Sequence, residues 1–150
     1  MKKIFLALIT AGMLAACNNT SKQTTATNAD SVAGKPTAAQ IAMAPVITFE
    51  SDSYDFGKIK EGDKVSHNFK FTNSGKSPLI ISSAVASCGC TTPEWPKEPV
   101  KPGDSGVIKV TFNSAGKGGL QDKLITITAN TIPAQNLAHL KGEVEVTKTK

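Results

Sequence analysis

From residue 46 onward, hydrophobic and polar residues alternate with a period of two, and no sustained helical period interrupts them. In the stretch 65–71, Val65, Phe69 and Phe71 are apolar at odd positions, and the even positions between them are polar. Such alternation is typical of a strand that buries one face. The pattern therefore predicts strands for most of the chain that follows residue 45.

The same alternation recurs between turn residues and predicts about seven short strands. They fall near residues 46–50, 54–56, 65–71, 79–81, 107–112, 124–128 and 137–146. About seven strands in roughly 100 residues favour an all-β, immunoglobulin-like antiparallel sandwich of two sheets. A small closed barrel is the alternative. The cysteine and tryptophan spacing of antibody domains is missing, so the prediction rests on the alternation alone.

The first 17 residues have the features of an export signal. Lys2 and Lys3 precede an apolar run over residues 4–16, which is shorter than the about 20 residues that a membrane-spanning helix needs. The run ends in Leu14-Ala15-Ala16-Cys17, which resembles the lipobox of bacterial lipoproteins. The resemblance implies cleavage before Cys17 and lipid on its side chain. We therefore expect a membrane-anchored protein of the bacterial cell envelope, at the outer membrane and facing the periplasm.

Residues 18–45 are mostly small and polar, and they contain too little apolar surface to fold by themselves. The sequence thus predicts a signal peptide over 1–16, a lipidated flexible, disordered tether over 17–45 and a folded sandwich over 46–147. Within the tether, Asp30-Ser31-Val32 resembles the acceptor pattern for O-linked glycans on exported Bacteroidetes proteins. Ser31 is therefore a candidate glycosylation site, with an unmodified linker as the alternative.

The charge of the chain excludes one class of partner. The formal net charge is +5, and it falls to +3 when Lys2 and Lys3 leave with the signal. All 17 basic residues are lysines, so the planar guanidinium that reads bases and phosphates is missing. We expect no nucleic acid partner.

The remaining two cysteines, Cys88 and Cys90, carry the main chemical question. Disulfides persist outside the cytoplasm, and Gly89 allows the bend that would bring the two α-carbons within disulfide range. Three interpretations stay open: a local disulfide or buried thiol pair that only packs, a thiol-redox or soft-metal site, and intermolecular pairing. The chain offers His67 and His139 as further ligands on other predicted strands, and His67 shares the parity of buried residues. No resident metal or cofactor is expected.

Two other motifs are predicted to have a structural role and not a catalytic or binding one. Gly103-Asp104-Ser105-Gly106 has the letters that surround a chymotrypsin-like nucleophile, yet it follows Pro102 as a turn into a strand and lacks a supporting His and Asp pair. Trp95 lies in a proline-rich connection, where we expect it to pack the loop onto the sandwich. The sequence predicts no catalytic residues.

Five short motifs are spread over the predicted sandwich: Tyr54-Asp55-Phe56-Gly57-Lys58-Ile59, Phe69-Lys70-Phe71-Thr72-Asn73-Ser74-Gly75, Ser87-Cys88-Gly89-Cys90-Thr91, Pro102-Gly103 and Ala129-Asn130. Together they resemble the bacterial domain-of-unknown-function 1573 family from about Phe49 to Val146. The resemblance implies a fold similar to Hydin-type and major-sperm-protein-like immunoglobulin domains. It implies no activity, ligand or catalytic residue.

Two functions follow from these observations. The leading one is a non-enzymatic binding or scaffolding module on the membrane, whose partner is an envelope protein of unknown identity. The alternative is a lipoprotein that handles thiols or a soft metal, copper or zinc, through Cys88-Gly89-Cys90.

Overall fold

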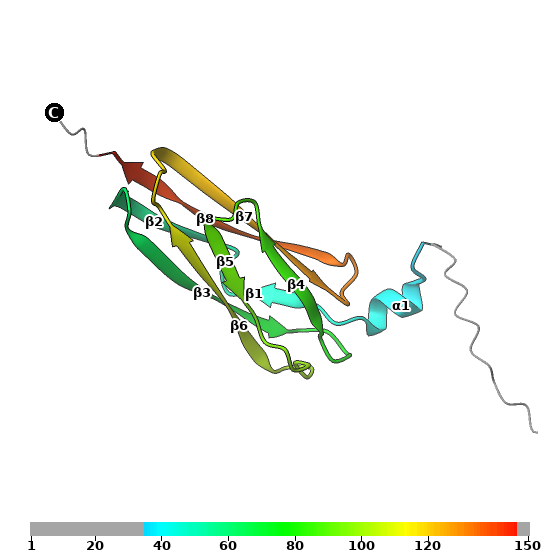
Figure 1. Ribbon diagram of the computed structural model, residues 1–150. Helices are drawn as coiled ribbons and strands as arrows, with labels where there is room; N and C mark the ends of the chain where they lie inside the picture. Colours follow the sequence, from blue (N-terminus) through cyan, green and yellow to red (C-terminus); the bar gives the residue numbers. More distant parts are fainter. Residues whose placement is uncertain (1–34, 147–150) are drawn as a thin grey trace, which may run out of the picture. The chain divides into compact units, whose positions relative to one another are not determined.

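The computed structural model describes residues 35–146, and this part contains one short helix and eight strands (Figure 1). They are α1 (Ala38–Met43), β1 (Ile47–Phe49), β2 (Ser53–Lys60), β3 (Lys64–Asn73), β4 (Ile81–Ala86), β5 (Thr91–Glu94), β6 (Ser105–Asn113), β7 (Gly119–Ala129) and β8 (Gln135–Glu145). The predictions for the signal peptide, Cys17 and Ser31 lie outside the described residues. Among residues 35–146, no helix has the length and apolar character that crossing a membrane requires.

The strands form two four-stranded sheets that face each other, with the orders β1-β3-β6-β5 and β2-β8-β7-β4. This arrangement confirms the predicted immunoglobulin-like sandwich and excludes the closed barrel for the described residues. One ladder differs from a wholly antiparallel sandwich, because β2 pairs with β8 in parallel. Residues 50–52 carry the chain from one sheet to the other without a hairpin, so β2 keeps the direction of β1 and joins the edge beside β8.

The core lies between the two inner faces, where the predicted alternation is confirmed. Phe69 and Phe71 on β3 and Phe112 on β6 are at most 1% exposed, and they meet Ile125 and Ile127 of the opposite sheet in one cluster. These large side chains remove apolar surface from water, which is the main favourable term in folding. The core fixes which residues of each strand face solvent, and so where a site can form.

Strand β5 was not predicted, because Pro93 and its neighbours indicated a surface connection. Proline is tolerated here because β5 is an edge strand that pairs only with β6. Trp95, two residues after Pro93, is half-buried against the core, and its indole Nε1 donates to the carbonyl of Ile81 at 3.2 Å. The expected packing role of Trp95 is therefore confirmed.

Strand β4 begins later than the sequence indicated. Residues 79–81 were predicted as a strand, but Leu79 makes only an isolated bridge to Val100, and the regular pairing with β7 starts at Ile81. After an irregularity between Ile81 and Ser83, the inward-facing residues are Ala84 and Ala86, and their small side chains give only a weak apolar signal in the sequence. Strand β4 thus extends beyond the apolar residues 79–81 and ends at Ala86, just before the cysteine turn.

Helix α1 lies inside the segment that was predicted to be wholly a flexible tether. Thr37 and Gln40 form a capping box at its start, which satisfies backbone amides that a helix leaves free. Its end is held by the Ser77 hydroxyl, which donates to the carbonyl of Met43 at 2.5 Å. Local capping and contact with the β3–β4 loop therefore order residues whose composition alone indicates disorder.

Candidate functional site at the cysteine turn

Cys88 and Cys90 lie in the turn that carries the chain from β4 in one sheet to β5 in the other. They are joined by a disulfide, with their α-carbons 5.3 Å apart. The backbone amide of Thr91 donates to the carbonyl of Cys88 at 3.2 Å and closes the turn. The Thr91 hydroxyl lies 3.6 Å from Cys88 Sγ and 3.9 Å from Cys90 Sγ. The sulfur atoms are therefore held beside a hydroxyl at the junction of the two sheets.

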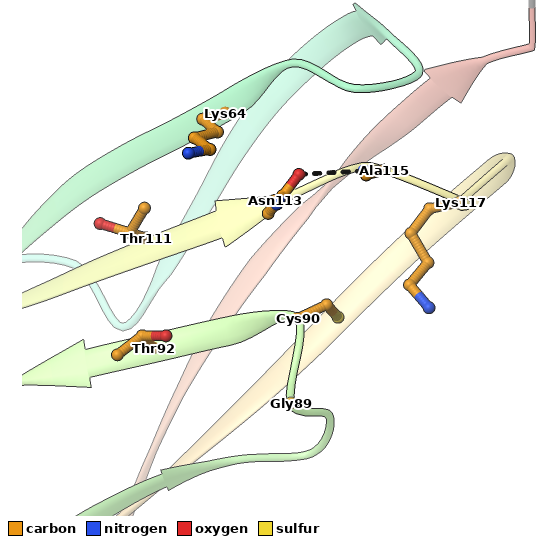
Figure 2. A pocket seen from close by; sticks show the side chains of 8 residues that line it. All are labelled: Lys64, Gly89, Cys90, Thr92, Thr111, Asn113, Ala115 and Lys117. Atoms are coloured by element: carbon orange, nitrogen blue, oxygen red, sulfur yellow. Dashed lines mark hydrogen bonds between the residues drawn. The ribbon is translucent and has the colours of Figure 1, made fainter.

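A hollow of about 360 Å³ opens beside this turn. Figure 2 shows that the side chains that line it belong to β3, β5, β6, the cysteine turn and the segment that follows β6. The residues that line it are Lys64, Gly89, Cys90, Thr92, Thr111, Asn113, Ala115 and Lys117. Hydroxyl, amide and ammonium groups dominate this lining, so the hollow suits a polar occupant.

The rim of the hollow is fixed by two hydrogen bonds. The amide of Asn113 donates to the carbonyl of Cys90 at 2.9 Å, which ties the cysteine turn to the end of β6. The Asn113 side chain accepts from the amide of Ala115 at 3.1 Å, as the dashed line in Figure 2 shows. These contacts hold Cys90 and the segment carrying Lys117 in place around the hollow.

Positive charge gathers at the hollow. Lys64 and Lys117 both line it, and no carboxylate is among the described residues that do. The pKa of nearby Lys123 is lowered mainly by burial and in part by the positive charge of Lys117. The ammonium of Lys123 lies 5.4 Å from the centre of the Phe112 ring. An anionic group in the hollow would lie near the two ammonium groups, and the Glu61 carboxylate, which accepts from the Gly116 amide at 3.2 Å, offsets part of their charge.

The two histidines that the sequence offered as metal ligands do not join the cysteines. His67 on β3 stacks on Tyr54 with ring centres 3.8 Å apart, and burial lowers its pKa. His139 on β8 places Nδ1 2.9 Å from Asp122 Oδ1. Within residues 35–146, no group of three or more His, Cys, Asp or Glu side chains could hold a metal ion.

The segment Gly103-Asp104-Ser105-Gly106 is a turn into β6, as expected. The Ser105 hydroxyl lies 3.0 Å from the Thr72 hydroxyl on the exposed side of the sheet. The carbonyl of Asp104 accepts from the amide of Asn73 at 2.9 Å. These contacts stabilise the strand pair β3–β6.

Sequence reasoning missed the two lysines of the hollow. Lys64 and Lys117 are 53 positions apart in the chain; Lys64 stands between Asp63 and Val65 and Lys117 between two glycines, and neither setting differs from that of an ordinary surface lysine. Only the pairing of Lys64 with Asn113 across β3 and β6 brings their segments to the same end of the sheet. No signal in the single sequence could have found them. Cys17 and Ser31 lie outside the described residues and stay predictions.

The fold defines this protein as an immunoglobulin-like β-sandwich. Residues 47–144 match the model of the family described as "Protein of unknown function (DUF1573)". The chain belongs to this family, and the resemblance seen in its motifs is confirmed. No curated protein matches the chain.

Solved structures with the same fold include a "protein of unknown function from Porphyromonas gingivalis W83", with 20% identity and a TM-score of 0.60. The match covers 71% of this chain and 50% of that one. The PapD-like domain 7 of human CEP192 is 10% identical with a TM-score of 0.57, over 79% of this chain and 98% of that domain. The secreted serine protease VesC from Vibrio cholerae is 14% identical with a TM-score of 0.51, over 68% of this chain and 23% of the protease.

The chain thus spans half of the Porphyromonas protein and less than a quarter of VesC. At these identities the likeness concerns the fold alone. It supports the PapD-like sandwich and carries no activity over to this chain.

Proposed function

We propose that this protein is a lipoprotein of the bacterial cell envelope, anchored in the outer membrane by lipid on Cys17 and facing the periplasm. Its sandwich acts as a non-enzymatic binding or scaffolding module for another envelope protein. The proposal for the anchor is supported by the lipobox-like stretch that ends at Cys17. Attachment through two or more acyl chains would be stable, since each buried methylene adds about 0.8 kcal/mol.

The observation that supports binding most directly is the hollow beside the cysteine turn. Its two ammonium groups, from Lys64 and Lys117, stand among hydroxyls and an amide at one end of the sheet that contains β3, β6 and β5. Such a surface can accept a carboxylate or another anionic group of a partner through charge-assisted hydrogen bonds. The rest of the sandwich holds this surface in position, as the scaffold of a binding module commonly does.

The anchor is tested with Cys17→Ser in the full chain. The variant should lose the mass of the lipid and leave the membrane fraction or stay uncleaved, because the acceptor sulfur is gone. Flotation of membranes and mass spectrometry of the amino-terminal peptide measure both effects. The matched control is Cys88→Ser with Cys90→Ser, which should float like the wild type. A Cys17→Ser protein that floats at the wild-type level and carries lipid would contradict the anchor.

The binding module is tested by cross-linked affinity capture from membranes. A partner that wild type and the double cysteine variant both retain, but that Lys64→Gln with Lys117→Gln loses, supports binding at the hollow without thiol chemistry. Lys70→Gln is the control, since Lys70 lies on the same strand but does not line the hollow. If the lysine variant retains every partner, the hollow is not the binding surface.

A thiol-redox role is the second candidate, and one observation favours it: Cys90 itself lines the hollow. A disulfide that reagents can reach is open to exchange, whereas a buried one is inert. In the capture experiment, loss of all partners in the double cysteine variant alone would favour this candidate. Binding of copper or zinc would require the reduced pair together with ligands from elsewhere, because zinc sites use four ligands.

A further inference from the structure

The two sulfur atoms of the disulfide differ in what surrounds them. Cys90 and Gly89 line the hollow, whereas Cys88 does not (Figure 2). A Cβ placed on Gly89 would have no heavy atom within 4 Å, so this residue leaves the approach open. The hollow therefore gives a reagent a route to Cys90 that it does not give to Cys88.

The charge of the hollow selects what can enter. Lys64 and Lys117 line it, and Figure 2 shows Lys64 on β3, across β6 from Cys90, and Lys117 on the segment that follows β6. The species that attacks a disulfide is the thiolate, and neighbouring cations both attract a thiolate and favour its ionised form. A thiol that carries further negative charge gains most, because the attraction grows with the charge of the ligand.

We propose that the hollow is an entry site for small anionic thiols and that Cys90 is the sulfur they attack. This inference rests on the thiol-redox candidate above. The incoming thiolate forms a bond to Cys90 Sγ, the bond between the two cysteine sulfurs breaks, and its electron pair leaves on Cys88 Sγ. The proton of the incoming thiol goes to solvent. The incoming sulfur is oxidised to a mixed disulfide, and Cys88 is reduced to a thiolate.

The position of Thr91 supports this direction of exchange. Its hydroxyl lies nearer to Cys88 Sγ, at 3.6 Å, than to Cys90 Sγ, at 3.9 Å. The hydroxyl can donate a hydrogen bond to the thiolate that forms on Cys88, and bonds to a charged acceptor are stronger than bonds to a neutral one. Cys88 then stays next to the mixed disulfide and can attack it to release the thiol.

The first test measures rates of reduction in the chain from residue 17 onward, with Cys17→Ser so that Cys88 and Cys90 are its two cysteines. Glutathione is the anionic probe, and cysteamine, whose ammonium balances its thiolate, is the comparison. At low salt, Lys64→Gln with Lys117→Gln should slow glutathione about fivefold and cysteamine much less. Lys70→Gln, on the same strand outside the hollow, should change neither rate.

The second test locates the attack. The reaction with glutathione is stopped with acid at early times, free thiols are blocked, and peptides are mapped by mass spectrometry. Glutathione should lie on Cys90 and the blocking group on Cys88. Single variants give the same comparison by another route, because the Cys90 thiol of Cys88→Ser should react with oxidised glutathione faster than the Cys88 thiol of Cys90→Ser.

The outcomes separate this inference from the candidate function on which it rests. Two results would overturn the entry site and leave a redox role standing. One is glutathione found first on Cys88, and the other is a rate of reduction by glutathione that is the same in the wild type and in Lys64→Gln with Lys117→Gln. A disulfide that neither thiol reduces in the folded protein would overturn both. Reduction by glutathione that is slower in the double lysine variant and starts at Cys90 supports the entry site and the redox role.

Discussion

Asn73 is fully buried at the end of β3 and uses both ends of its amide. Its Oδ1 accepts from the amides of Val46 and Gly75 at 3.3 and 3.0 Å, and its Nδ2 donates to the carbonyls of Ser77 and Val100, each at 2.9 Å. One side chain thus fastens three segments of the chain. Buried polar groups are costly when they lose their partners, so this residue stabilises the end of the sandwich.

Replacement of Asn73 by Ala should therefore destabilise the domain by about 3 kcal/mol, because buried amides and carbonyls lose their partners together. Urea unfolding followed by tryptophan fluorescence measures the change. Asn68→Ala is the matched control, since Asn68 is exposed on the same strand, and it should stay within roughly 0.5 kcal/mol of the wild type. Equal stability of the two variants would show that the network is weaker than its geometry indicates.

His67 gives the domain a pH dependence of known sign. Burial lowers its pKa below the ordinary value of 6.5, so the unfolded chain binds a proton at a higher pH than the folded one does. Its contribution is present above pH 6.5 and is lost as the pH falls from there toward the folded pKa. His67→Gln should therefore lose less stability than the wild type between pH 7.5 and pH 5.5, as urea unfolding at both values measures. Parallel curves for the two proteins would contradict this.

At the scale of the elements, the pairing of β3 with β6 sets the shape of the core. Gly106 on β6 lies opposite Phe71 on β3, and a Cβ at Gly106 would overlap the ring of Phe71. The missing side chain therefore makes the space that the aromatic ring fills. The same strand pair places Lys64 beside Asn113 and so builds one wall of the hollow.

Gly106→Ala should destabilise the domain by roughly 1–3 kcal/mol, because the well-packed Phe71 must move. The matched control is Gly89→Ala, which adds the same methyl group where no heavy atom lies within 4 Å. Thermal unfolding followed by circular dichroism compares the two variants. A Gly106→Ala protein that melts with the wild type would show that the ring shifts at no cost.

At the scale of the whole molecule, the two sheets rely on their shared core and not on the disulfide. The bridge closes a loop of three residues, for which the loop-entropy model gives under about 2 kcal/mol. The large side chains between the sheets, with Phe69 and Phe112 among them, are fully buried by contacts within the core. The bridge therefore adds little to the stability that the core supplies.

Reduction of Cys88 and Cys90 should therefore lower the free energy of unfolding by less than about 2 kcal/mol and leave the domain folded. Urea unfolding of the chain from residue 17 onward, with and without reductant, measures the difference. Cys88→Ser with Cys90→Ser, studied in the same two conditions, controls for effects of the reductant itself. A domain that unfolds on reduction would contradict the assignment of stability to the core.

The sequence by itself determined the sheets, because alternation such as that of Phe69 and Phe71 follows directly from the period of a strand with one buried face. It also determined the family, through short motifs that can each be read locally, and the closeness of Cys88 to Cys90, which are two positions apart. Tertiary structure alone decided the rest. Pro93 can join a strand because β5 lies at the edge of its sheet, and contact with the β3–β4 loop orders α1. The pairing of β3 with β6 places Lys64 at the end of the sheet where Cys90 and Lys117 line the same hollow. These features depend on residues distant in the chain, and no local pattern records which distant residues will meet.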